Sequence, residues 1–155
     1  MNISKFTQKS QEVVQGCEKI AMDYGHQEIG QEHLLMAMMD VEDSLIRKLI
    51  EKMGIEPEVF TAQIEGLLNK RPKVSGGQMH IDQPLNETLM YAEDEAKRMG
   101  DEYVSVEHLF LSLLAHPSKE IKALMKQSQI TRERFLQALS QVRGNQRVTS
   151  DNPEA

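Results

Sequence analysis

The sequence predicts an all-α protein of eight helices, built as two tandem four-helix repeats that are related by a pseudo-two-fold axis. The main observation is an internal duplication, because a shift of 75 residues matches the chain to itself without a gap from Glu12 to Phe60. Most matched residues are apolar at helical spacing or are glycines at helix ends, so one packing plan is repeated. The period is longer than the ~20 to 50 residues of usual solenoid units, which favours two packed halves.

The duplication is clearest in two phrases, IGQEHLLMAMM at residues 29–39 and VSVEHLFLSLL at residues 104–114. Both place an acid and a histidine before a leucine or phenylalanine segment, so that Glu32 and His33 match Glu107 and His108. Further identical pairs are Gly25 with Gly100, Ile46 with Ile121, and Phe60 with Phe135.

The first repeat is expected over about residues 4–69. Its first helix should start near Ser4 or Phe6 and end at Gly25, because glycine readily takes the left-handed conformation that closes a helix. The second and third helices are expected over residues 31–39 and 44–53. Pro57 then fits the first turn of a fourth helix, where its missing N–H has no cost.

Residues 70–82, KRPKVSGGQMHID, break both periodicities with a proline and two glycines and are expected to connect the halves. The basic cluster of Lys70, Arg71 and Lys73 is interpreted as part of a solvated linker. The second repeat is expected over about residues 83–143, with helices that end at Gly100 and that span about 105–115, 119–127 and 131–142. The polar residues 144–155 are interpreted as a linker or tail.

Composition narrows the functional classes. The 155 residues fit about one domain, and 39% hydrophobic with only 5% aromatic residues suits a helical core of Leu, Ile, Met and Ala. The formal charge of -6 argues against a nucleic-acid partner, because phosphate binding needs clustered Lys and Arg. No segment approaches the ~18 apolar residues of a membrane helix, and the N-terminus lacks a signal-peptide pattern. A cytoplasmic protein without a membrane partner is expected.

Motifs for catalysis are missing from the sequence. The glycines in residues 76–79, GGQM, are not followed by the Lys and Ser or Thr of a phosphate-binding loop. Glu32 and His33 are adjacent and point about 100° apart on a helix, whereas zinc proteases space two histidines at i and i+4. We therefore expect no catalytic residue, metal site or cofactor in this chain, and histidines that pack and hydrogen-bond at helix starts.

Two other features are local. Cys17 matches Ala92 in the second repeat, which indicates a small buried side chain. Met90 and Tyr91 lie off the apolar stripe that carries Leu89, and they match Gln15 and Gly16. An exposed apolar pair is a candidate contact site, although single exposed apolar residues are common on any protein.

The chain has two helical repeats, and in each a first helix that ends at a glycine is followed by a motif of the type (I/V)-x-x-E-H-(L/F)-L. This arrangement resembles the N-terminal domain of the Clp ATPases, the ring-forming AAA+ unfoldases. The resemblance covers about residues 6–144. Two segments are more similar to ClpB-type disaggregases than to ClpA or ClpC types: LLNKRPKVSGG in the connector and QVRGNQRVTSDNPEA at the end. The resemblance implies a binding domain over residues 1–145, followed by a linker over residues 146–155 that leads to an ATPase module. That module would use ATP and Mg in a hexamer, while the isolated domain would be a monomer.

The ClpB-type resemblance implies that the domain binds unfolded or aggregated polypeptide and delivers it to the ring. The substrate groove of such domains corresponds here to Thr7, Leu89, Tyr91, Asp101 and Glu107. His108 and Glu95 stand where ClpB-type domains often carry apolar residues, so a more polar groove is expected.

ClpC-type domains are also similar, and they imply an alternative site in which Glu32 and Glu107 bind phosphorylated arginine, with adaptor proteins as further partners. A guanidinium offers planar donors to a carboxylate, but the phosphate would need a cation or a helix N-terminus. A free-standing enzyme is the third hypothesis, and the missing motifs disfavour it.

Overall fold

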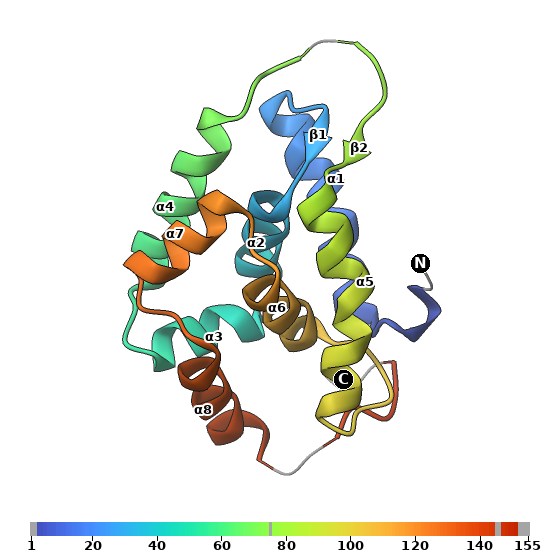
Figure 1. The fold of residues 1–155 in the computed structure, drawn as a ribbon, viewed down its shortest axis with the longest axis vertical. Helices are drawn as coiled ribbons and strands as arrows, with labels where there is room; N and C mark the ends of the chain where they lie inside the picture. Colours follow the sequence, from blue (N-terminus) through green and yellow to red (C-terminus); the bar gives the residue numbers. More distant parts are fainter. Residues whose placement is uncertain (1–2, 75, 145–146, 152–155) are drawn as a thin grey trace.

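The computed structural model describes residues 3–74, 76–144 and 147–151. In these residues eight α-helices carry the fold, which confirms the all-α class (Figure 1). The first repeat contains α1 (Gln8–Tyr24), α2 (Gln31–Asp40), α3 (Leu45–Lys52) and α4 (Pro57–Lys70). The second contains α5 (Gln83–Arg98), α6 (Val106–Ala115), α7 (Lys119–Gln127) and α8 (Arg132–Arg143). Of the linker expected over 146–155, residues 146 and 152–155 lie outside the described residues.

Local signals fix the ends of α1. Gly25 closes the helix with a φ of 73°, as predicted. The helix begins later than predicted, because Ile3–Lys5 form a separate 3-10 turn (η1) and Thr7 is the N-cap. The Thr7 side chain accepts a hydrogen bond of 3.1 Å from the Ser10 amide, and such a cap sets where a helix starts.

Two short parallel pairings join the repeats and were not predicted. Strand β1 (Glu28–Ile29) pairs with β2 (His80–Ile81), with Ile29 opposite Ile81, and Phe6 forms a parallel bridge with Val104. A shift of 75 residues carries Ile29 to Val104 and Phe6 to Ile81. Exchanging the two repeats therefore exchanges the two pairings, as a pseudo-two-fold axis requires. Pairings of one or two residues are too short to leave a period-two pattern in the sequence.

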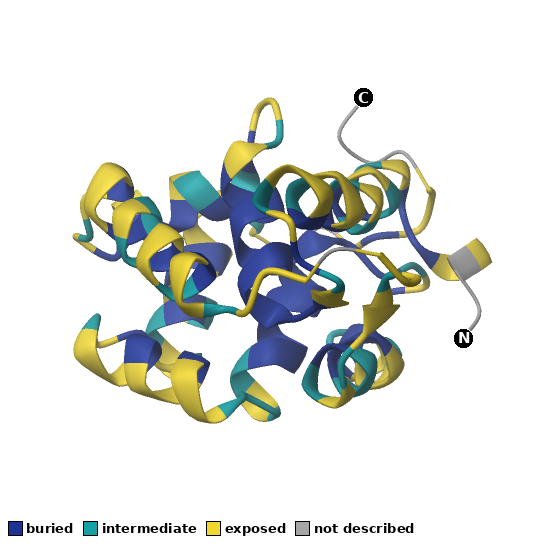
Figure 2. Ribbon diagram, turned by 90° about the horizontal axis from the view of Figure 1, so that it is seen from above, coloured by how far each residue is buried: buried dark blue, intermediate teal, exposed yellow. Residues whose placement is uncertain are grey.

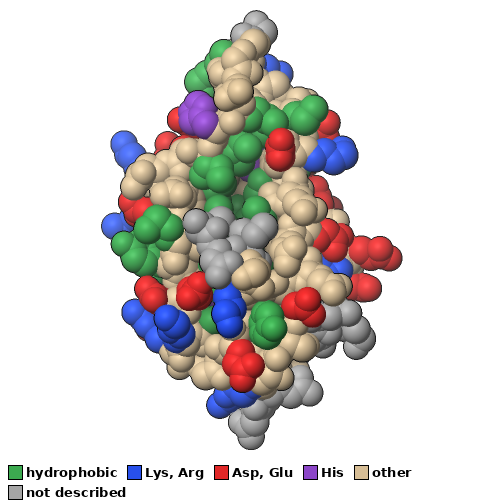
Figure 3. Space-filling view, turned by 90° about the vertical axis from the view of Figure 1, so that its right-hand side faces the viewer, with side chains coloured by type: hydrophobic (Ala, Val, Ile, Leu, Met, Phe, Trp, Pro, Cys, Tyr) green, Lys and Arg blue, Asp and Glu red, His purple; other side chains and the backbone are tan. Residues whose placement is uncertain are grey.

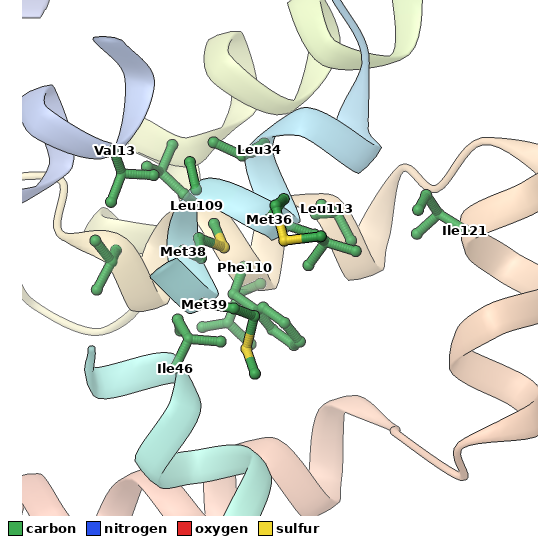
Figure 4. Close-up of a cluster of buried hydrophobic side chains, with 14 of the residues drawn as sticks. Val13, Leu34, Met36, Met38, Met39, Ile46, Leu109, Phe110, Leu113 and Ile121 are labelled. Atoms are coloured by element: carbon green, nitrogen blue, oxygen red, sulfur yellow. The ribbon is translucent and has the colours of Figure 1, made fainter. Parts of the chain in front are cut away.

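Helices α2 and α6 form the centre of the core (Figure 2). Every residue of α2 from Gln31 to Met39 is buried, and so is α6 from Val106 to Leu113. Methionines of α2 lie near apolar side chains of α6, as labelled in Figure 4 for Met36, Met38, Met39, Leu109, Phe110 and Leu113. Phe110 also stacks on Phe135 of α8, with ring centroids 4.5 Å apart. These three methionines are therefore core residues.

The interpretation of the basic cluster as a solvated linker is wrong for Arg71. Lys70 and Lys73 are exposed, but the Arg71 side chain is only 16% exposed and contacts three carboxylates. Sequence spacing did not indicate this, because Glu32 is 39 residues away.

The polar C-terminal segment also packs on the domain. Val148 is 5% exposed, and its carbonyl accepts hydrogen bonds from the amides of Glu102 and Tyr103, at 2.8 and 3.2 Å. Its own amide donates to Asp101 at 2.9 Å. Val148, which belongs to the expected linker, is therefore part of the packed structure. Among the described helices, none is long and apolar enough to cross a membrane.

Candidate functional site

The two duplicated histidines fix the starts of the central helices. His33 and His108 each occupy the third position of their helix, and each Nδ1 accepts a hydrogen bond of 2.9 Å from a backbone amide, that of Gly30 or Ser105. The predicted role at a helix start is confirmed. Because Nδ1 is an acceptor, the neutral ring carries its proton on Nε2 and can donate from there.

The partner of that Nε2 differs between the repeats. His33 Nε2 lies 2.9 Å from His26 Nδ1, whereas His108 Nε2 lies 2.6 Å from Asp101 Oδ2. Burial, followed by the charge of Arg71, lowers the pKa of His33 to about 4. Burial also lowers the pKa of His26 and that of His108, the latter against the opposing effect of Glu107 and Asp101. The described residues contain no group of three or more His, Cys, Asp or Glu placed to hold a metal ion.

In the first repeat, Glu32 is bound by a guanidinium. Arg71 donates from Nε and Nη2 to the two oxygens of Glu32, at 2.8 and 3.0 Å, and from Nη2 to Asp82 at 2.9 Å. Burial alone would lower the pKa of Arg71, but the hydrogen bonds to Glu32 and Asp82 raise it above its usual range. A Cβ at Gly30 would lie 1.9 Å from Arg71 Nη2, so the missing side chain leaves room for this arginine.

In the second repeat, Arg143 takes the corresponding role for Glu107. Its Nη1 lies 3.4 Å from Glu107 Oε2, and its Nη2 donates to Asp101. Burial would raise the pKa of Asp101, but hydrogen bonds from Arg143, the Val148 amide and His108 outweigh it, and the pKa is lowered. The two arginines are not matched by the duplication, because the 75-residue shift carries Leu68 to Arg143. In each repeat the buried glutamate is thus paired with an arginine near the end of the fourth helix, but the two arginines stand at different positions of the repeat.

The predicted groove residues do not share one surface. Thr7, Asp101 and Glu107 are buried in polar contacts, and Leu89 is buried on the face of α5 toward α1. Tyr91 is 39% exposed and stacks on His116, with ring centroids 4.5 Å apart. Glu95, expected to make the groove more polar, is buried and paired with Arg132 at 2.8 Å.

An apolar groove of about 290 Å³ does lie between α1 and α5. Its lining includes Val14, Cys17, Ile29, Met79, Ile81 and Leu89. Figure 3 faces the side on which α1, α5 and β2 lie, and hydrophobic side chains gather in the upper half of that face. Burial raises the pKa of Cys17 to about 12, so this side chain stays a thiol and contributes apolar surface.

Of the five residues predicted for a substrate groove, only Leu89 lines this one, and most of its other lining residues were not predicted as site residues. Ile81 is 45% exposed, and it reaches the groove because β2 is held against β1. The available signal was a methionine and an isoleucine, Met79 and Ile81, close to the start of α5 in a largely polar connector. An apolar groove whose lining includes a methionine, an unbranched and adaptable side chain, can accept varied apolar side chains.

Comparison with known proteins gives a consistent result. Residues 5–128 match the family described as Clp repeat (R) N-terminal domain. The chain is 44% identical, over 99% of its length, to the chaperone protein ClpB of Nitratidesulfovibrio vulgaris and 36% identical, over 100% of its length, to that of Bacillus cereus. It spans 18% of the length of each of these relatives.

Solved structures share the fold at low sequence identity. The Hsp104 N-terminal domain from Candida albicans has a TM-score of 0.84 at 19% identity, covering 97% of this chain and 99% of that one. A complex of the ClpV N-domain with a VipB peptide has a TM-score of 0.71 at 19% identity, covering 99% of this chain and 92% of that one.

Proposed function

Because this chain belongs to the family of Clp repeat N-terminal domains, we propose that it is the substrate-recognition domain of a ClpB-like AAA+ disaggregase. It binds unfolded or aggregated polypeptide and delivers it to an ATPase ring, which as a hexamer would use ATP and Mg. The observation that carries the proposal is the apolar groove between α1 and α5. The relatives named ClpB support the disaggregase role over the ClpC-type role.

The groove suits short apolar stretches of an unfolded chain. Its wall combines side chains from both repeats, such as Val14 of α1 and Leu89 of α5, with Ile81 exposed at the edge. Apolar contact releases water without requiring a fixed sequence, so many polypeptides can bind. A short peptide in this groove would bury much less surface than the ~1,200 Å² of a stable interface, and we expect affinities on the order of 10 μM or weaker.

The remaining predicted site residues take different roles in this proposal. Tyr91 offers an exposed aromatic surface next to His116 and can extend the contact beyond the groove. Thr7 caps α1, while Asp101 and Glu107 bind Arg143, so these three would hold the elements around the groove in place. The N-domain of ClpV binds a peptide of VipB, which supports peptide binding by this fold.

Titration with a chemically unfolded, alkylated polypeptide tests the proposal. Replacement Ile81→Glu puts a charge at the edge of the groove and should weaken binding about tenfold or more, at little cost in stability because Ile81 is 45% exposed. The matched control is Val59→Glu on α4, which is 54% exposed and lies outside the groove lining. Equal affinity in both variants would contradict the assignment of the groove.

The ClpC-like alternative keeps one specific observation in its favour. Glu32 and Glu107 each bind a guanidinium, as a phosphoarginine site would require. Both guanidiniums, however, belong to the chain itself, so a phosphoarginine ligand or its adaptor would have to displace Arg71 or Arg143. Competition between peptides with arginine and with phosphoarginine tests this. A preference for phosphoarginine that Glu32→Gln and Glu107→Gln both remove would favour the ClpC-like role.

A further inference from the structure

A second apolar cleft lies on the other side of α5, away from the proposed groove. It has a volume of about 580 Å³ and lies where the end of α6, α7 and the start of α8 meet the end of α5. Its floor is apolar and is formed mainly by Leu114, Pro117, Met125 and Ile130. None of these residues lines the α1–α5 groove, so the two surfaces can be tested separately.

The rim of this cleft is basic, in a chain whose formal charge is -6. Four cations line it, Arg98, Lys122, Lys126 and Arg132. Glu95 neutralises part of this charge, since it pairs with Arg132 at 2.8 Å and with Arg98 at 3.7 Å. Glu133 is a further acid that acts on Arg132.

The two lysines remain without a carboxylate partner among the described residues. Lys122 and Lys126 lie one turn apart on α7 and are both exposed. Like charges at this spacing repel each other and destabilise a helix, and a bound carboxylate would relieve the repulsion.

We propose that this cleft, the α5–α7 cleft, binds an acidic amphipathic segment of a partner protein. A leucine-like side chain would enter the apolar floor, and flanking Asp or Glu side chains would meet Lys122, Lys126 and the exposed Arg98. Charge complementarity of this kind sets the choice of partner and the association rate more than it sets affinity. The apolar floor distinguishes this occupant from nucleic acid, which binds through phosphates and through stacking on aromatic side chains.

The experiment uses the 155-residue chain and a labelled short peptide in which leucines are flanked by glutamates, followed by fluorescence anisotropy. The same peptide with glutamine in place of glutamate, and one with serine in place of leucine, are the ligand controls. We expect both controls to bind at least about tenfold more weakly. Binding of the glutamate peptide should also weaken as salt is raised, because the rim is exposed.

Variants of the chain test whether the peptide binds in the α5–α7 cleft. The double replacement Lys122→Glu with Lys126→Glu should weaken binding about tenfold or more, whereas Lys48→Glu, an exposed lysine on α3, should leave it unchanged. Ala115→Trp should fill the cleft and block binding, and Ala123→Trp, on the exposed face of α7 outside this lining, is its control.

Three outcomes would overturn the proposal. The first is equal binding of the glutamate and glutamine peptides, and the second is an equal loss of binding in the Lys48→Glu control. The third is equal binding of the serine peptide or of RNA, which would identify a general polyanion surface. Melting temperatures of all variants establish that a loss of binding is not a loss of fold.

Discussion

His26 and Asp101 occupy equivalent places in the two repeats, and each hydrogen-bonds Nε2 of the histidine that fixes the next helix, at 2.9 and 2.6 Å. The carboxylate of Asp101 is fully paired, by Arg143 and the Val148 amide as well as by His108. His26, in contrast, has its Nε2 buried without a hydrogen-bond partner among the described residues. The first repeat therefore lacks, at this place, the carboxylate that stabilises a protonated histidine in the second.

Acid should destabilise the chain before its carboxylates titrate. The pKa of His33 is about 4 in the folded state and about 6.5 when unfolded, so the unfolded chain binds an extra proton between these values. The resulting stability is fully present above pH 6.5 and is lost as the pH falls toward 4, by up to about 3 kcal/mol. The lowered pKa values of His26 and His108 act in the same direction. Urea unfolding at stepped pH measures this.

Replacing His26→Asp gives the matched test, because it copies the second repeat into the first. A carboxylate next to His33 should raise the pKa of His33, and this can be followed by NMR of the ring protons. The pH dependence of the unfolding free energy between 6.5 and 4 should become shallower. An unchanged His33 pKa would contradict the pairing.

Arg71→Ala should destabilise the fold by about 3 kcal/mol, because it leaves the buried carboxylate of Glu32 and the partly buried carboxylate of Asp82 without their cation. Chemical denaturation measures the effect. Lys73→Ala, two residues along and exposed, is the control and should change stability by less than about 0.5 kcal/mol. Similar values for the two variants would restore the interpretation of this segment as a solvated linker.

Val148→Asp should destabilise the fold by about 2 kcal/mol, since it buries a charge beside Asp101 at a position that is 5% exposed. The exposed neighbour Thr149→Asp adds the same charge and should be nearly neutral. If thermal unfolding gives the two variants the same melting temperature, the C-terminal segment does not pack on the domain in solution.

Tyr91→Ala should lower the affinity for unfolded polypeptide by roughly 1 to 2 kcal/mol if the ring is a contact residue. Its cost in stability should stay below about 1 kcal/mol, because the side chain is 39% exposed and contributes mainly the stacking on His116. The same peptide titration with Gln15→Ala is the comparison. Gln15 matches Met90 in the duplication and lines the α1–α5 groove, so this variant shows how much affinity is lost when a groove side chain other than Tyr91 is shortened. Unchanged affinity would restrict the site to the groove itself.

The sequence by itself determined the helices and their duplication. Apolar spacing and helix ends at glycines depend on neighbours within a few residues. The end of α1 at Gly25 and the burial of Leu89 and Cys17 could therefore be predicted. The histidine at each helix start is also a local contact, three residues from its amide partner. The exposure of Met90 and Tyr91 followed from their place off the apolar stripe.

Only the tertiary structure decided which polar residues are paired and where a groove opens. Arg71 reaches Glu32 across 39 residues and Arg143 reaches Glu107 across 36, from positions that the duplication does not match. Two carboxylates that looked available for a ligand, and the Asp101 of the predicted groove, are therefore bound within the chain. Ile81 enters the α1–α5 groove because a two-residue strand pairing holds it there. Contacts of this kind depend on how distant helices pack, and a single sequence records the residues but not the distances between them.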